Sequence, residues 1–263
     1  MKKIIILLAG AIIGVIVLNS CSYEDMMDKL VPKKEAKMAE DYLTKLRQRD
    51  FEYIKGQFSD EIRPKVTDGL LVQMADYFRH GELLSTQIIG SQVYEANGVW
   101  KGNFSFEYHF TDGWNLANAA FRKVGDKYEV IGLNVYQTKM SQKEYNAFKL
   151  SGKSPLQYLV LALAVFVPLF ILVTTYFCIR TPMAKRKWLW IIFILLGVCA
   201  IRVNWTTGQF AIQLISVHLL GAGAGAASPY APWIISASIP LGAILFWINR
   251  KRFIQLDSEA GAG

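Results

Sequence analysis

Cysteine is scarce in this sequence, which has only Cys21, Cys178 and Cys199. Residues 22–153 contain none, and no two cysteines have the spacing of a zinc site, a redox pair or a disulfide framework. The N-terminal half must therefore fold around a hydrophobic core alone, for which about 125 residues is long enough. We expect no metal and no cofactor.

Net charge is also lacking in residues 22–153, which hold 19 of the 29 Lys and Arg and 19 of the 21 Asp and Glu. The formal charge of +8 therefore arises in the rest of the chain, where ten basic residues (29 minus 19) outnumber two acidic ones (21 minus 19). That surplus lies beside long apolar segments, where the positive-inside rule predicts it. The basic isoelectric point thus does not indicate a nucleic-acid partner.

Charge is absent between Lys153 and Arg180 as well. The apolar stretch there supplies the roughly 20 residues that cross a ~30 Å hydrocarbon core. It predicts a membrane-spanning helix over about 156–178, kinked at Pro168. The four basic residues at 180–187 predict that the following loop is cytoplasmic.

Two further apolar stretches, 188–205 and 231–249, predict spans, and the second ends on the basic residues 250–252. The segment 210–227 has a Gly-Ala run that forms helix poorly, so we interpret it as interfacial or re-entrant. A fourth crossing there would put the basic C-terminus outside the cell, against the rule. We therefore expect an all-α transmembrane bundle over 155–252 with three crossings, and a cytoplasmic tail at 253–263.

The N-terminal 21 residues have the order of a bacterial export signal: Lys2 and Lys3, an apolar run from Ile4 to Leu18, then Asn19-Ser20-Cys21. The ending resembles a lipobox, which implies that Cys21 is lipidated after cleavage. The alternative is an uncleaved signal anchor. Either interpretation places residues 22–153 outside the cytoplasm, with 22–34 as a tether, and the apolar helices indicate the bacterial inner membrane.

Residues 35–150 predict an extracytoplasmic α+β domain. Apolar residues at helical spacing indicate a helix over 34–49, a short one over 51–58 after a cap at Asp50, and a third over 66–80 that Gly81 ends. After Gly81, the apolar residues recur at every second position instead of at helical spacing. Strands are expected over 84–94, 104–110, 114–124 and 128–136, joined by turns that contain Gly. The prediction is N-terminal helices packed on an antiparallel meander.

This order of elements, with the segments "DFEYIKGQFSDEI", "FEYHFTDGW" and "GDKYEVIGLNVY", resembles the nuclear transport factor 2-like superfamily, in particular small bacterial lipoprotein-associated members of unknown function. The resemblance covers about residues 35–136. It implies a cone-like fold, in which a curved sheet wraps on the helices and leaves a pocket at its open end. It also implies a possible relation to ketosteroid-isomerase-like enzymes, whose base is an Asp or a His.

His109 and Asp112 are the weak candidates for such a base. His109 lies on the polar side of its strand, so a surface histidine explains it at least as well, and Asp112-Gly113 fits a plain turn. Aromatic residues offer a second kind of site. A ligand pocket would take its walls from rings such as Tyr77, Trp100, Tyr108, Trp114 and Tyr136. The same rings are needed to fill the core of a thin domain.

The sequence thus supports two hypotheses. One is a non-enzymatic, membrane-anchored binding or scaffolding protein, whose partner is the lipid bilayer and an envelope protein, peptide, lipid or small apolar ligand near it. The other is an enzyme of ketosteroid-isomerase-like type that acts on a small apolar substrate. A cavity that joins His109 or Asp112 to a Tyr would favour the enzyme, and an interior filled with rings would favour the binding protein.

Overall fold

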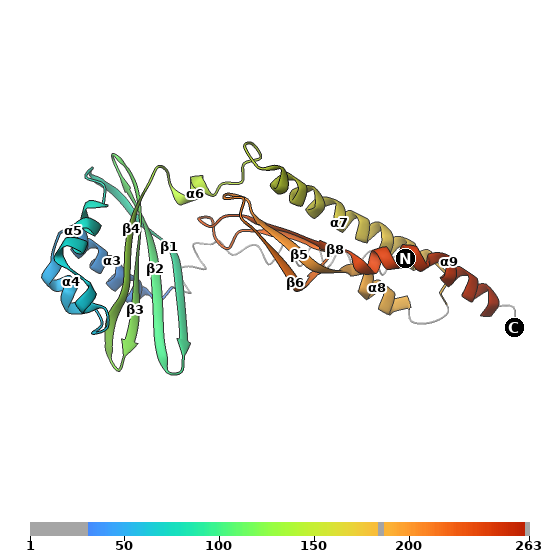
Figure 1. Cartoon of the computed structure of the whole chain (residues 1–263), viewed down its shortest axis with the longest axis horizontal. Coiled ribbons are helices and arrows are strands. Elements are labelled where there is room, and N and C mark those ends of the chain that lie inside the picture. The colour runs from blue at the N-terminus through green and yellow to red at the C-terminus, as the bar shows by residue number, and fades with distance from the viewer. Residues whose placement is uncertain (1–30, 184–186, 261–263) are drawn as a thin grey trace. The chain divides into compact units, whose positions relative to one another are not determined.

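The structure is a computed structural model that describes residues 31–183 and 187–260, and the side chains among them up to Phe253. The chain forms two compact units that divide between Glu144 and Tyr145 (Figure 1). The predicted export signal, the predicted lipidation site Cys21 and most of the predicted tether lie outside the described residues.

Helices open the first unit: α3 spans Lys33–Arg47, α4 spans Phe51–Gln57 and α5 spans Asp68–Asp76, with the 3-10 turn η1 at Arg63–Lys65. The apolar stripe of α3 is buried, as its spacing predicts. Asp50 caps α4, because its side chain accepts a hydrogen bond from the backbone of Tyr53, so the predicted cap is confirmed. Thr67 caps α5 in the same way, through the backbone of Leu70.

The strands of this unit are β1 (Leu83–Ala96), β2 (Val99–Phe110), β3 (Gly113–Val124) and β4 (Lys127–Thr138). They form an antiparallel sheet in the order β1-β2-β3-β4, the meander that the alternation predicts. The β1–β2 turn uses Asn97 and Gly98, both at positive φ. Such angles suit the primed two-residue turn, which follows the twist of the strands.

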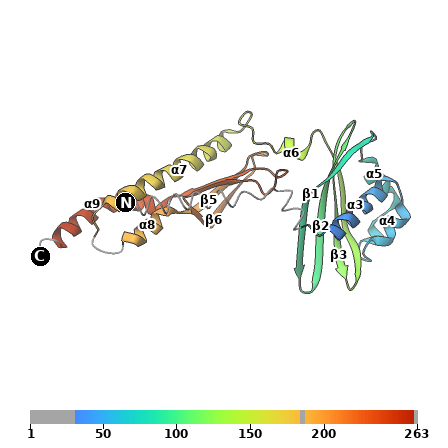
Figure 2. The ribbon, with the colours of Figure 1, turned by 180° about the vertical axis from the view of Figure 1, so that it is seen from behind.

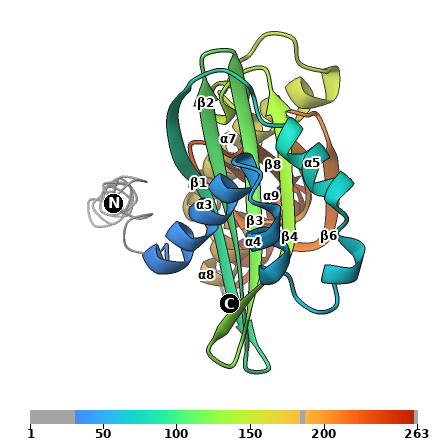
Figure 3. The same cartoon turned by 90° about the vertical axis from the view of Figure 1, so that its left-hand side faces the viewer.

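Helices α3, α4 and α5 lie over one face of this sheet (Figure 3). Between them lies a core in which Phe104, Phe106, Tyr108 and Phe110 of β2 are all buried. Their neighbours in β3, Ala117 among them, are small, so rings of β2 and of the helices can pack together there. The sequence gives every second residue of β2 to this core, as expected for a half-buried strand.

The second unit begins with α6 (Gln142–Tyr145) at its border and the long helix α7 (Pro155–Arg180). Its other helices are α8 (Lys187–Leu195) and α9 (Leu241–Ala260). Its strands are β5 (Leu196–Asn204), β6 (Phe210–Leu219), β7 (Ala222–Gly225) and β8 (Ile234–Ile239). These strands form an antiparallel sheet in the order β6-β5-β8-β7. Figure 2 shows α7 alongside this sheet and alongside α8 and α9.

The prediction of an all-α transmembrane bundle is therefore wrong. The expected span 188–205 is α8 followed by β5, the expected interfacial helix 210–227 is β6 and β7, and the expected span 231–249 is β8 followed by α9. Hydropathy marks all these segments as apolar, but a short apolar run has the same composition in a buried strand as in a helix. The turn at Leu220-Gly221, both at positive φ, joins β6 to β7, and Pro240 lies between β8 and α9, where it keeps the preceding residue out of the helical conformation.

Among the described helices, α7 alone is long and apolar enough to cross a membrane. A topology with three spanning helices is thus not supported. Pro168 lies inside α7, as expected. The first half of α7 packs on the sheet through Val160, Val203 and Ile235, whereas its second half packs on α8 and α9 through residues such as Ile171, Ile194 and Phe246.

Candidate functional site

The two candidate bases do not meet in a cavity. His109 and Trp114 lie opposite each other on β2 and β3, and their rings stack with centroids 3.8 Å apart and an angle of 8° between planes. Asp112 is exposed in the β2–β3 turn, where its side chain lies against Gly81. Neither residue has a second titratable group positioned for proton transfer. The geometry supplies no acid–base pair here.

The five candidate pocket rings separate into different environments. Tyr108 is only 2% exposed and packs edge-on against Phe78 in the core, and burial raises its pKa far above the usual value. Trp100 packs against Tyr128 beside the same core. Trp114 stacks on His109, and Tyr136 is exposed. The interior of the described first unit is thus filled with rings, and Tyr77 of the five lines a pocket.

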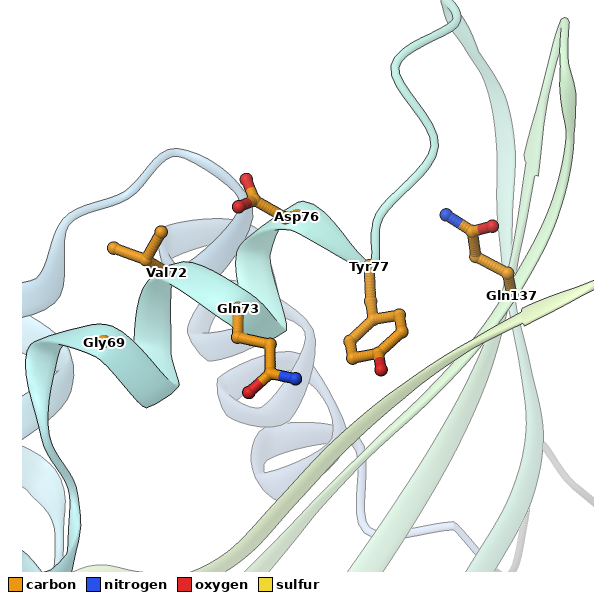
Figure 4. A pocket seen from close by; sticks show the side chains of 6 residues that line it. All are labelled: Gly69, Val72, Gln73, Asp76, Tyr77 and Gln137. Carbon is orange, nitrogen blue, oxygen red and sulfur yellow. The ribbon is translucent and has the colours of Figure 1, made fainter.

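That pocket lies between α5 and β4 and has a volume of about 400 Å³ (Figure 4). All of its lining residues are exposed: Gly69, Val72, Gln73, Asp76, Tyr77 and Gln137. In Figure 4 the side chains of Gln73 and Tyr77 point toward the sheet, whereas Asp76 points away and pairs with Arg49. The pocket therefore offers two amides and a phenol, which donate and accept hydrogen bonds but carry no charge.

Asn115 positions both walls of this pocket, although little in the sequence distinguishes it from other residues of its strand. It is fully buried on β3, and its amide donates to the carbonyl oxygens of Tyr77 (2.7 Å) and Tyr136 (3.1 Å). Its side-chain oxygen accepts a hydrogen bond from the backbone N–H of Arg79 at 2.8 Å. The available signal was a polar residue in the register of buried Ala117 and Phe121.

Glu107 is a second residue whose environment the sequence did not reveal. It lies on β2 and is 5% exposed, although strand alternation places it on the polar side. Its carboxylate accepts a hydrogen bond from the backbone N–H of Gln142. Burial raises the pKa of Glu107, while the hydrogen bond from Gln142 and the charge of His109 act in the opposite direction. The segment that covers it comes from beyond β4, so only the tertiary structure explains the burial.

A larger cavity of about 580 Å³ lies where α4 and its following loop meet β4. Its walls carry charges of both signs, with Asp60, Arg63, Lys127 and Glu129 among them. The hydroxyl of Tyr128 donates to Glu35 at 2.5 Å, and this bond raises the pKa of Tyr128 to about 12. Arg63 pairs with Asp60 at 2.9 Å, so part of this charge is already matched within the wall.

The second unit carries two aromatic clusters at different heights on α7. The first cluster contains Phe148, Tyr158, Trp205 and Trp233, in which the rings of Phe148 and Trp205 stack at 5.0 Å. The second cluster contains Tyr176, Phe177, Trp190, Trp247 and Phe253. Tyr158 and Tyr176 are 18 residues apart on one helix, which corresponds to about 27 Å. That spacing matches the two interfaces of a bilayer, where Trp and Tyr gather.

Basic residues gather at the second cluster. The guanidinium of Arg180 lies over the ring of Tyr176 at 5.5 Å, and Lys187 donates to the carbonyl oxygen of Ile179 at 3.3 Å. Arg250 lies over the rings of Phe177 (5.2 Å) and Trp247 (5.1 Å). Of the basic residues after position 154 that the structure describes, Arg202 lies in strand β5, away from this end. Within the described ranges, no group of His, Cys, Asp and Glu could hold a metal ion.

No family model matches this chain, and no curated protein is similar to it. Among solved structures, the solution structure of a SEC-C motif containing protein from Rhodopseudomonas palustris is similar to part of it, with 16% sequence identity. The match covers 35% of this chain and 70% of that chain, with a TM-score of 0.27, which is too low to support an argument about fold or function. The resemblance to the nuclear transport factor 2-like superfamily stays a prediction.

Proposed function

We propose that this protein is anchored in a bacterial inner membrane by α7 and presents its first unit outside the cytoplasm as a binding or scaffolding domain. The partner is an envelope component close to the membrane, and it contacts the pocket between α5 and β4. The observation that carries the proposal is the pair of aromatic clusters on α7, since their spacing of about 27 Å fits a bilayer.

The exposed surface of the second unit supports a lipid environment. On α7, Val165, Phe166 and Leu169 are more than half exposed. Strand β6 exposes six large apolar side chains, and Ile215 among them is fully accessible. Water would penalise an apolar surface of this size, whereas lipid tails do not.

The proposed orientation of the protein in the membrane follows from the positions of its basic residues. Arg180, Lys187 and Arg250 gather at the C-terminal end of α7 and indicate its cytoplasmic end. Residues that precede α7 then belong to the opposite side, in agreement with the export-type order of residues 1–21.

Binding is favoured over catalysis by the interior of the first unit. Phe104, Phe110 and Phe121 occupy the space in which a cone-like domain would hold an apolar substrate. The pocket that remains open is lined by exposed, uncharged polar groups of Gln73, Tyr77 and Gln137. Such groups suit recognition of a polar partner surface, and no observation on the described residues favours an isomerase.

Topology is tested with single cysteines and a membrane-impermeant maleimide on intact spheroplasts. Asp126→Cys, in the exposed β3–β4 turn, should be labelled at once, whereas Lys251→Cys should react only after the membrane is opened. The parent chain gives the background from its own cysteines. Labelling of Lys251→Cys without Asp126→Cys would reverse the proposed orientation.

The partner surface is tested with a photo-crosslinking amino acid in place of Tyr77. Tyr53 is the matched control, because both rings are 45% exposed and only Tyr77 lines the pocket. We expect a discrete crosslinked species from position 77 in living cells and none from position 53. Equal or absent crosslinking at both positions contradicts the choice of this pocket.

A further inference from the structure

The basic end of the second unit has no acidic residue to match it. The sequence contains no Asp or Glu between positions 145 and 256, and the described part of this unit shows no ion pair. Arg180, Lys187, Arg250, Lys251 and Arg252 nevertheless lie at the end of α7 or on the adjoining turns of α8 and α9. We define these five residues as the basic cluster. No acidic side chain among the described residues of this unit pairs with the basic cluster, so the cluster attracts anions.

Arg250 differs from the other members of the basic cluster in how firmly it is held. Its guanidinium lies over two rings, Phe177 of α7 and Trp247 of α9, at 5.2 and 5.1 Å from their centroids. Trp247 is itself fixed, because its indole N–H donates to the hydroxyl of buried Thr174 at 2.9 Å. The planar cation is thus positioned before any ligand arrives, which lowers the entropy lost on binding.

The hydrogen-bonding capacity of Arg250 is not used within the described residues. Its Nε is buried and has no hydrogen-bond partner. Because this atom is covered by protein, an external ligand would have to bind the other N–H groups of the guanidinium. Arg180 and Lys187 lie at the same end of α7, the first over Tyr176 and the second at the carbonyl oxygen of Ile179. A ligand at Arg250 would therefore find further cations close by.

We infer that the basic cluster binds the phosphate headgroup of an anionic phospholipid, with Arg250 as its central contact. The remaining N–H groups of the Arg250 guanidinium make no hydrogen bond within the described residues, and the fork of a guanidinium fits two oxygens of one phosphate. A lipid is the occupant because the site adjoins the second aromatic cluster and the apolar surface of α7, against which acyl chains can lie. This inference rests on the proposed membrane anchorage of α7.

The test is native mass spectrometry of the full chain in detergent, titrated with dioleoyl phosphatidylglycerol or with dioleoyl phosphatidylcholine. We expect the anionic lipid to bind at least tenfold more tightly than the zwitterionic one. Arg250→Ala should remove most of that preference, and Arg250→Lys should remove a large part of it, because lysine keeps the charge but loses the planar fork. Arg202→Ala is the control, because it removes the same charge from an exposed position of β5 outside the basic cluster.

Two outcomes overturn the inference. If Arg250→Ala and Arg202→Ala weaken binding equally, the lipid is attracted by charge alone and no built site exists. If inorganic phosphate at millimolar concentration displaces the lipid headgroup and stabilises the protein equally well, the ligand is free phosphate. Alkaline carbonate extraction of the same variants separates this failure from failure of the anchor: a wrong lipid site leaves the wild-type chain in the membrane, whereas a wrong anchor releases it.

Discussion

Each unit of this protein contains a four-stranded antiparallel sheet, yet the edge strands of the two sheets differ in their side chains and in the regularity of their pairing. Edge strand β1 of the first sheet carries Gln, Ser and Glu residues and two irregularities in its pairing with β2. Edge strand β6 of the second sheet carries no charged residue and exposes Phe210, Leu214 and Ile215. Polar side chains and bulges protect an edge from association in water. The exposed side chains of β6 thus favour an apolar neighbour, although the unpaired backbone groups of this edge still need hydrogen-bond partners.

The cores differ as well. The first core is a layer of large rings between helices and one face of a sheet, with Phe104 and Tyr108 buried. The second unit also buries large side chains such as Trp205 and Phe246, but it adds a close backbone contact, that of Gly242 of α9 against α8 at Phe193. Close backbone approach at small residues is typical of helices in lipid, where burial of apolar side chains offers no advantage over contact with lipid tails. Four predictions test this comparison.

The largest effect is expected from removing a ring of the first core. Phe104→Ala should lower the free energy of unfolding of the first unit by about 3–5 kcal/mol, because it leaves a cavity among fixed neighbours. Leu214→Ala in β6 should change stability by less than about 0.5 kcal/mol, since Leu214 is 78% exposed. Pulse proteolysis in urea, applied to the detergent-solubilised chain, measures both. Similar losses for the two variants would show that β6 is packed.

The second-largest effect on stability is expected from removing buried polar side chains. Asn115 makes three hydrogen bonds to main-chain atoms, whereas Ser238 of β8 donates one, to the carbonyl oxygen of Gly221 at 2.8 Å. Asn115→Ala should cost about 1–3 kcal/mol and loosen the α5–β4 pocket, and Ser238→Ala should cost about 1 kcal/mol. Hydrogen exchange of the segment around Tyr77 would reveal the loosening. If hydrogen exchange around Tyr77 were the same in Asn115→Ala as in the parent chain, Asn115 would not position this segment.

Glycine-to-alanine changes should have opposite signs in the two units. A Cβ added at Gly242 would lie 2.1 Å from the carbonyl oxygen of Phe193, so Gly242→Ala should force α8 and α9 apart and cost more than about 1 kcal/mol. At Gly56 in α4 nothing lies within 4 Å, and Gly56→Ala should stabilise the first unit by about 0.5–1 kcal/mol. Thermal unfolding of the two variants gives the comparison. A stabilising Gly242→Ala would refute the close helix contact.

The smallest effect concerns pH. Because burial raises the pKa of Glu107, the folded state holds this proton to a higher pH than the unfolded chain does. Its contribution to stability is fully present below about 4.5 and is lost as pH rises through the raised pKa. Glu107→Gln keeps an acceptor for Gln142 and should remove this loss. Urea unfolding of both proteins from pH 4 to pH 8 measures the slope, and parallel curves would contradict the raised pKa.

The comparison also explains which parts of the structure the sequence could predict. Strand β2 was recognisable because one face meets the core and the other does not, so Phe104, Phe106 and Tyr108 alternate with polar residues. Strands β5 and β8 lack that contrast: Ser236 and Ser238 are buried along with Ile235 and Ala237. Without alternation, an apolar strand beside an apolar helix has no distinguishing signal, and the predicted membrane bundle was wrong for that reason.

The residues of the candidate site also differ in whether the sequence could identify them. Tyr77 was named from its residue type and does line a pocket, whereas Tyr108 and Trp100 were named with it and belong to the core. Asn115 and Glu107 were not singled out, because their roles depend on main-chain groups of Tyr77, Tyr136 and Gln142 that approach from distant parts of the chain.

By itself the sequence determined the balance of charge in residues 22–153, the apolar helix over Leu156–Tyr176 and the period-two strands of the first unit, because each depends on neighbours along the chain. The tertiary structure decided the rest. Residues 188–249 form strands as well as helices in the folded chain, and Glu107 is buried. Arg250 lies over the rings of Phe177 and Trp247. These features come from contacts between residues far apart in the chain, and local periodicity carries no record of them.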